Sequence, residues 1–346
     1  MSYTNGLDNP ELYFQTKLYA GTGGNSHAIT FDASENMQPD WVWIKARNSN
    51  SHRLTDSVRG ATKILYSDLN FAEVTDADTI QSFDTDGFTI DDDADTNGSG
   101  INFASWNWKA GGSASSNSDG SITSTVSANT TAGFSIVSYT GNGSAGATIG
   151  HGLGAVPQVY ILKNRSSSAG WTSYFEPLGN TKFLQLDTTG AAGTATEAFN
   201  NTSPTSSVFS IGTDTSTNNN TDNFIAYCFA EKKGYSKFGS YTGNGNADGV
   251  FVYLGFKPSF VMTKCTSASG QSWHMQDNKR DGFNYNNHRL FANSSGAEET
   301  TVRMDLLSNG FKYRDGDGQT NGATYIFMAF SESSFVNSKG VPNNAR

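Results

Sequence analysis

The sequence holds little of several residue types on which whole classes of protein depend. Charged residues make up 16% of its 346 positions, whereas an average soluble domain carries about 25%. Lys and Arg number 23 against 32 Asp and Glu, and the formal charge of −9 argues against the basic footprint of a nucleic-acid-binding protein. No apolar run approaches the roughly 18 residues of a membrane-spanning helix. We therefore expect neither nucleic-acid binding nor membrane insertion.

Cysteine is also scarce. The two cysteines, Cys228 and Cys265, are too few for a disulfide scaffold and share no metal-ligand spacing. Each lies in a predicted strand, which indicates a reduced, small core residue. The first residues show no basic segment followed by an apolar stretch, so we expect no secretory signal and folding in a reducing cytoplasm.

What the sequence does contain indicates an all-β protein. Glycine occurs 37 times and aromatic residues reach 12%, while Ser, Thr, Asn and Gly fill the spaces between short apolar runs. Aromatic and β-branched residues favour strands, whereas helices need Ala, Leu, Glu and Lys in quantity. The composition therefore predicts many short strands joined by polar turns.

The strongest pattern is internal repetition of four elements in one order. The first is a proline followed six residues later by a lysine across an apolar run, as expected of a buried strand that begins with proline. It occurs at residues 39–45, 157–163 and 258–264, and its lysines are Lys45, Lys163 and Lys264. We expect these lysines to cap strand ends in contact with solvent. The other repeated elements are a closing aromatic strand (103–108, 224–229, 325–330), a Phe-containing pair (87–88, 208–209, 310–311) and an opening segment (18–23, 138–143, 240–245).

The length of the repeat predicts duplicated domains. Successive copies are separated by 118 residues from Pro39 to Pro157 and by 101 residues from Pro157 to Pro258, which is too long for a solenoid. The sequence thus predicts three tandem β-sandwich domains at 18–112, 134–233 and 234–335. It further predicts a Ser/Thr-rich linker at 113–133, whose later part could form an edge strand, and extended arms at 1–17 and 336–346. Because the joint at 232–235 is short, the second and third domains are expected to pack as a rigid pair.

Several long phrases resemble those of tail-fibre-like virion proteins of marine bacteriophages. These phrases lie at residues 5–10, 37–45, 119–134, 229–245 and 340–346. The resemblance as a whole covers most of the chain. It implies a β-rich structural or host-attachment part of a phage particle, assembled in the host cytoplasm. It also implies a homo-oligomer, by analogy a trimer, whose terminal arms dock to other virion proteins. In this family, Asn-Pro-Phe follows the terminal strand, whereas this chain has Ser333-Ser334-Phe335.

Two main functions follow as hypotheses. The first is a tail fibre or tail-associated receptor-binding protein that contacts a glycan or protein on the host surface. The second is a purely structural capsid fibre, decoration protein or tail connector without a ligand. A polysaccharide-degrading attachment protein is a third, minor alternative, but the acidic residues lie mostly in turns and not in an evident pair. The chain has no Gly-x-Ser-x-Gly or phosphate-loop motif and its five histidines are scattered, so we expect no enzyme.

One acidic turn matches the opening of a calcium loop. Asp93, Asp95 and Asn97 are followed by Gly98, and alternating oxygens of this kind can surround a hard cation. The twelfth position, which should supply a bidentate Glu, is Ala104. A solvated turn and a calcium site both remain open.

The sharpest binding hypothesis from the residues is carbohydrate recognition. Lectin sites place an aromatic face against a sugar ring and surround it with carboxylate, amide or guanidinium groups. The predicted loops carry Trp171 with Glu176, and Trp273 with Asp277 and Arg280. In the alternative, these tryptophans close the end of a sandwich and Asp277 forms a structural salt bridge with Arg280, as the matching Asp56 and Arg59 would. The sequence leaves both interpretations open.

Overall fold

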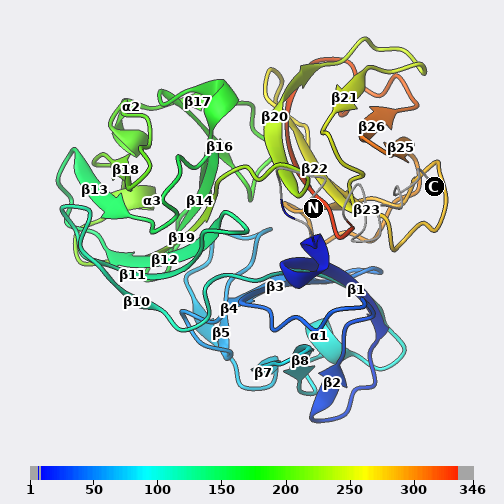
Figure 1. The fold of residues 1–346 in the computed structure, drawn as a ribbon, viewed down its shortest axis with the longest axis horizontal. Helices are drawn as coiled ribbons and strands as arrows, with labels where there is room; N and C mark the ends of the chain where they lie inside the picture. Colours follow the sequence, from blue (N-terminus) through cyan, green and yellow to red (C-terminus); the bar gives the residue numbers. More distant parts are fainter. Residues whose placement is uncertain (1–6, 8, 334–346) are drawn as a thin grey trace, which may run out of the picture.

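The computed structural model describes residue 7 and residues 9–333, which form an all-β molecule of three lobes (Figure 1). The prediction of an all-β fold is confirmed. We refer to residues 9–112, 134–233 and 234–333 as units 1, 2 and 3. Among the described residues, no helix is long and apolar enough to cross a membrane.

Unit 1 contains a four-stranded sheet in the order β1-β9-β3-β4 and a smaller sheet in the order β2-β8-β7. Its elements are η1 (Pro10–Leu12), β1 (Phe14–Ala20), β2 (His27–Ile29), β3 (Trp41–Ala46), β4 (Arg53–Asp56), β5 (Lys63–Ile64), β6 (Val74–Thr75), β7 (Ile80–Asp84), β8 (Gly87–Ile90), α1 (Ala94–Asn97) and β9 (Asn102–Trp108).

Unit 2 repeats this order as β12-β19-β14-β15, with β13-β18 as its small sheet. Its elements are β12 (Phe134–Thr140), β13 (Ala147–Gly150), β14 (Val159–Asn164), β15 (Thr172–Phe175), η2 (Glu176–Leu178), β16 (Lys182–Gln185), β17 (Gly193–Thr194), α2 (Thr196–Phe199), β18 (Val208–Ile211), α3 (Thr215–Asn218) and β19 (Asn223–Phe229).

Unit 3 repeats it again as β20-β27-β22-β23-β24, with a small sheet in the order β21-β26-β25. Its elements are β20 (Ser236–Thr242), β21 (Phe251–Tyr253), β22 (Phe260–Cys265), β23 (Trp273–Asp277), β24 (Leu290–Phe291), β25 (Met304–Leu307), β26 (Gly310–Tyr313) and β27 (Thr324–Phe330).

Each large sheet has two apolar faces, and each face has its own partner. One face packs against the small sheet of the same unit and forms a local core. The other face packs against the large sheets of the other two units, so a single apolar cluster contains residues from all three. All six tryptophans of the chain lie in this central cluster. The three lobes of Figure 1 are therefore parts of one folded body, and the packing is not restricted to units 2 and 3.

The segment predicted as a linker contains two strands that cover one edge of unit 2. These strands are β10 (Ser115–Asn117) and β11 (Ser124–Asn129), and β11 pairs with β12. Between them, the backbone N–H of Ile122 donates to the carbonyl oxygen of Thr148 on β13 at 3.1 Å. The suggestion of an edge strand within this segment is confirmed, whereas its description as a linker was wrong. The corresponding edges β1 and β20 lie at the ends of their sheets, without such a cover among the described residues.

The predicted boundary of the N-terminal arm was also wrong. Strand β1 starts at Phe14, and the side chain of Phe14 is fully buried in the central cluster. Its ring contacts those of Trp108 and Phe330 at centroid distances of 4.9 and 5.5 Å. Residues 14–17 therefore belong to β1 of unit 1, and the first three of them are buried. Residues 1–6 and the predicted C-terminal arm at 336–346 lie outside the described residues.

The two cysteines are free and buried, as predicted. Both lie on large sheets, Cys228 on β19 and Cys265 on β22, and each belongs to the local core of its own unit. They act as small core residues.

Candidate functional site

The tryptophans proposed to bind sugars are buried between units. The side chains of Trp171 and Trp273 are completely inaccessible to solvent. The indole N–H of Trp171 donates to the carbonyl oxygen of Tyr66 in unit 1 at 2.7 Å, and that of Trp273 donates to the carbonyl oxygen of Gln185 in unit 2 at 2.9 Å. Because neither ring presents a face to solvent, the prediction that they stack on a sugar was wrong.

His52 completes this set of contacts in the third interface. It occupies in unit 1 the place of the two tryptophans, and burial lowers the pKa of its imidazole to about 3. The indole N–H of Trp43 donates to its Nδ1 at 2.8 Å, so Nε2 carries the proton and donates to the carbonyl oxygen of Phe291 in unit 3 at 2.9 Å. The three contacts run from unit 1 to 3, from 2 to 1 and from 3 to 2, which describes an approximate threefold arrangement within one chain.

Asp277 and Arg280 form a buried ion pair in the same interfaces. The guanidinium Nε of Arg280 lies 2.6 Å from Oδ2 of Asp277, and both side chains are inaccessible. The same carboxylate oxygen accepts a hydrogen bond from the indole of Trp106 in unit 1 at 3.1 Å. These residues therefore join two units, and their assignment to a sugar site was wrong. Glu176 is exposed at the start of η2, whereas Trp171, the ring predicted to act with it, is buried.

The three repeated lysines are buried, contrary to the expectation of solvent contact. Lys45, Lys163 and Lys264 have no exposed surface. Each ammonium group donates to a backbone carbonyl of the neighbouring unit: Lys45 to Ser295 at 3.4 Å, Lys163 to Asn70 at 3.1 Å and Lys264 to Gly190 at 2.7 Å. Burial lowers the pKa of each of them to about 8.

The predicted calcium loop is a helix cap. The carboxylate of Asp93 accepts hydrogen bonds from the backbone N–H groups of Asp95 and Thr96 and so caps α1, while Asp95 pairs with Arg53. The amide of Asn97 donates to the carbonyl oxygens of Gly24 and Asp91. Within the described part of the chain, no group of three or more His, Cys, Asp or Glu side chains could hold a metal ion. The interpretation of Asp93, Asp95 and Asn97 as calcium ligands was therefore wrong.

The same asparagine recurs in each unit and explains why the turn is repeated. Asn218 donates to the carbonyl oxygens of Ser144 and Gly212, and Asn321 donates to those of Asn246 and Asp315. In every unit this amide ties the helical or turn segment to the Gly-containing opening segment. The repeated polar residues thus stabilise the fold.

The exposed aromatic side chains are concentrated in unit 3. Phe251, Tyr253, Phe283 and Tyr285 are exposed by 45%, 59%, 83% and 50%. Phe251 and Tyr253 alternate with the buried Val252 on β21, so both point away from the local core. In the register of the small sheet, Phe251 lies opposite Lys312, and Lys312 lies opposite Asp305.

Tyr285 extends this row beyond the last strand. The bridge between Asn286 and Met304 places Tyr285 opposite Asp305, and the guanidinium of Arg303 lies 4.8 Å from the centroid of the Tyr285 ring. We call the outward side of this sheet the aromatic face. It consists of Tyr253 and Leu307 together with the cross-strand row Tyr285, Asp305, Lys312 and Phe251, and the cations Arg303 and Arg314.

Units 1 and 2 carry small neutral side chains at the matching positions. Each small sheet has one Phe that pairs with an aliphatic residue of the neighbouring strand: Phe88 with Ile29, Phe209 with Ile149 and Phe311 with Val252. The residue before that aliphatic residue is Ala28 in unit 1, Thr148 in unit 2 and Phe251 in unit 3. Lys312 corresponds in the same way to Thr89 and Ser210. Unit 3 alone therefore presents two ring systems joined by charged residues.

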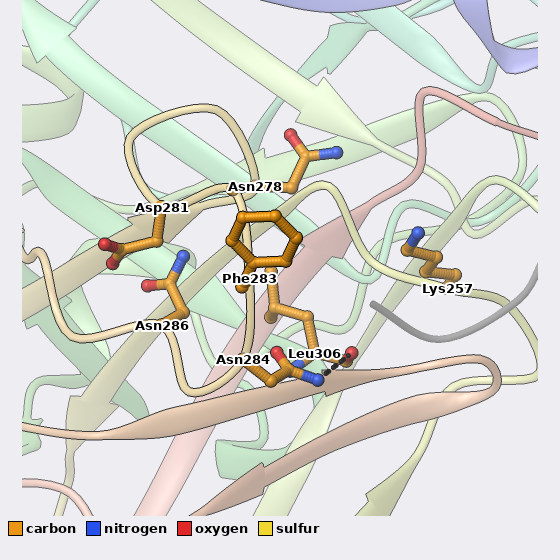
Figure 2. Close-up of a pocket in the computed structure, with 8 residues that line it drawn as sticks. Lys257, Asn278, Asp281, Phe283, Asn284, Asn286 and Leu306 are labelled. Atoms are coloured by element: carbon orange, nitrogen blue, oxygen red, sulfur yellow. Dashed lines mark hydrogen bonds between the residues drawn. The ribbon is translucent and has the colours of Figure 1, made fainter.

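A small depression lies beside the Phe283 loop of unit 3 (Figure 2). It is lined by Lys257, Asn278, Asp281, Gly282, Phe283, Asn284, Asn286 and Leu306. The side chain of Asn284 both donates to the carbonyl and accepts from the N–H of Leu306 at 3.0 Å, and Asp281 accepts from the backbone of Asn287 and His288. These contacts hold the loop against β25 and so position Tyr285.

Sequence reasoning missed the aromatic face because its residues are distant in the chain. A signal was nevertheless present: Phe251 and Tyr253 depart from the small residues that the other two copies carry. A departure from an internal repeat is the pattern expected where one copy has acquired a role that the others lack.

The geometry defines a class of protein: a single-chain assembly of three β-sandwich units around one aromatic core, in which unit 3 also carries the exposed aromatic face. The chain belongs to the family described as a domain of unknown function, DUF7483, whose model matches residues 9–334. The match spans all three units, so the family corresponds to the whole folded body. No curated protein and no solved structure matches the chain.

Proposed function

We propose that this protein is a bacteriophage virion component, most specifically a tail fibre or tail-associated receptor-binding protein that contacts the host cell surface. The proposal starts from the resemblance of residues 37–45, 119–134 and 229–245 to tail-fibre-like virion proteins. It is carried by the aromatic face of unit 3, because large exposed apolar side chains gathered on one face mark interaction sites.

The remainder of the molecule supports a role as a rigid carrier for that face. The units are held together by a buried aromatic core, by buried ion pairs and by lysine–carbonyl contacts, so the position of unit 3 relative to the other two is fixed. An attachment protein outside the cell benefits from such rigidity, because contact energy is then not spent on ordering the binding surface.

Immunogold labelling of intact particles, viewed by electron microscopy, tests the assignment. We expect label at the distal tail with an antibody that recognises the native protein. Label over the head would contradict receptor binding and favour a decoration protein, and the absence of label would contradict a virion role. Preincubation of host cells with the purified chain should also reduce adsorption, and the F251A variant should do so less effectively.

Docking to other virion proteins and trimer formation are part of the same proposal. Because β1 begins at Phe14, a docking test must spare the core and remove only residues 1–6. We expect this deletion to leave the thermal midpoint unchanged and to reduce incorporation into particles. Light scattering of the purified chain should give three times the mass of one copy, whereas a monomer would contradict the trimer.

A further inference from the structure

We propose that the aromatic face of unit 3 binds an acidic oligosaccharide. The inference names the ligand class for the surface on which the proposed function rests. It depends on three features of that surface: ring platforms at both ends of one cross-strand row, an excess of cationic groups around them, and the absence of both in the other two units.

The first feature is a ring that lies along the sheet and leaves one side exposed. Two ring carbons of Phe251 lie 2.8 and 2.9 Å from the position that a Cβ atom of Gly310 would occupy. The ring therefore extends over the glycine of the neighbouring strand, in space that a larger residue would fill. An exposed aromatic face of this kind suits the C–H face of a sugar ring.

The second ring platform lies at the other end of the row. Tyr285 is separated from Phe251 by the strands that carry Asp305 and Lys312. Three spacings of about 4.8 Å place the two ends roughly 14 Å apart. That span favours an extended oligosaccharide over a single sugar, with the side chains in the middle of the row within reach of its hydroxyl groups.

The charges favour an acidic ligand. Arg303 and Lys237 lie over aromatic rings, those of Tyr285 and Tyr253. Neither cationic side chain forms an ion pair among the described residues, although the backbone N–H of Arg303 donates to the carboxylate of Asp315 at 2.7 Å. Two further cations, Lys312 and Arg314, share the carboxylates of Asp248 and Asp305. Four cationic side chains and three carboxylates, those of Asp248, Asp305 and Asp315, thus lie on or beside this face, on a chain whose formal charge is −9. A uronate or sulfate group would meet complementary charge here.

Titration calorimetry of the full chain tests this inference, with a uronic-acid hexasaccharide as the probe and a neutral glucan hexasaccharide of the same length as its control. We expect saturable binding of the uronate only, weakened by added salt because exposed charges are screened. F251A should weaken it about tenfold or more, as truncation of an aromatic residue that carries much of the binding energy does. R303Q should weaken it as well and should reduce its salt dependence.

The matched control is F71A, since Phe71 is also exposed, by 52%, but lies in unit 1. This variant should bind the uronate as the unmodified chain does. No uronate binding, equal binding of the neutral glucan, or unchanged binding by F251A would overturn the inference. Failure of the proposed function is distinguishable: label over the phage head with intact uronate binding would refute tail attachment and leave the glycan site standing.

Discussion

The phenolic O–H of Tyr227 in unit 2 donates to the carboxylate Oδ2 of Asp56 in unit 1 at 2.7 Å, in a region closed to solvent. The same carboxylate pairs with Arg59, whose own terminal nitrogen lies 3.3 Å from the Tyr227 oxygen. Asp277 and Trp106 form the matching contact between units 3 and 1. In the third interface the corresponding positions hold Phe175 and Met328, and both lie in the central apolar cluster. The donor and the acceptor are thus replaced together.

Removal of the Asp56 carboxylate, which Tyr227 and Arg59 share, should strongly destabilise the fold. In D56A the buried guanidinium of Arg59 loses its nearer carboxylate and keeps only that of Glu73 at 3.2 Å, so the loss of unfolding free energy should approach about 3–5 kcal/mol, the cost typical of a broken buried ion pair. Urea unfolding measures the loss, with D92A, at an exposed site of unit 1, as the control. A loss below about 1 kcal/mol, the range of ordinary surface changes, would contradict this role of Asp56. The double variant D56A/Y227F should lose less than the sum of the single variants, because the two residues share one contact.

The buried lysines should make stability rise with pH on the alkaline side. Burial lowers the pKa of Lys163 in the folded chain to about 8 from its ordinary 10.5, so between these values the unfolded chain binds more protons than the folded one. Each pH unit in that window should therefore add up to about 1.4 kcal/mol per lysine to the stability. If only the unmodified chain is measured, the ionisation of other groups over the same pH range obscures the contribution of the lysines.

The clean measurement is the difference between the unmodified chain and K163M. Urea unfolding at pH 8, 9 and 10 should show the stability of the unmodified chain rising relative to that of K163M, since other titrating groups contribute equally to both. A constant difference would mean that Lys163 keeps its ordinary pKa in the folded chain.

Inward lysines on the open edges of units 1 and 3 should prevent strand addition. Lys237 on β20 lies on the same side of its strand as the buried Tyr241 and reaches the ring of Tyr253 at 5.2 Å. On β1, Lys17 lies on the same side of the strand as Tyr19, two residues further along, and pairs with Asp32. Unit 2 has the apolar Val137 where unit 1 has Lys17, and there β11 covers the edge. Inward-pointing charges are a common protection of sheet edges.

We therefore expect K237V to self-associate. Sedimentation velocity over a range of concentrations should show species larger than those of the unmodified chain, and K237R, which keeps the charge, should behave like the latter. Unchanged sedimentation of K237V would show that the edge is protected by other means.

Added calcium should have no effect on the stability of the fold, whereas substitution of Asn97 should lower it. Addition of calcium or of a chelator is expected to leave the thermal midpoint unchanged, because the oxygens of Asp93 and Asn97 already accept backbone N–H groups. N97A leaves the buried carbonyl group of Asp91 unsatisfied, at a cost of about 1–3 kcal/mol, and also removes the donor to the half-buried carbonyl of Gly24. A rise of the midpoint with calcium would restore the ion-site interpretation.

The sequence by itself determined the all-β class and the order of strands within each copy. Short apolar runs bounded by proline and Asn-Gly turns specify strands through local chemistry, since proline cannot donate to a ladder and glycine accepts the positive φ of Gly143 and Gly245. The small, buried state of Cys228 and Cys265 followed from the same runs. These features depend on neighbours in the chain and can therefore be predicted from it.

Only the tertiary structure decided what the second apolar face of each large sheet packs against. A tryptophan in a polar loop, such as Trp171, looks the same whether it awaits a sugar or the carbonyl of Tyr66, and the difference depends on where another unit lies. The same holds for Lys45, whose burial requires a carbonyl group of Ser295 that is 250 residues distant. The aromatic face likewise exists because register places Tyr285 and Phe251 in one row. Contacts between distant segments are selected by packing of the whole chain, and local sequence does not encode them.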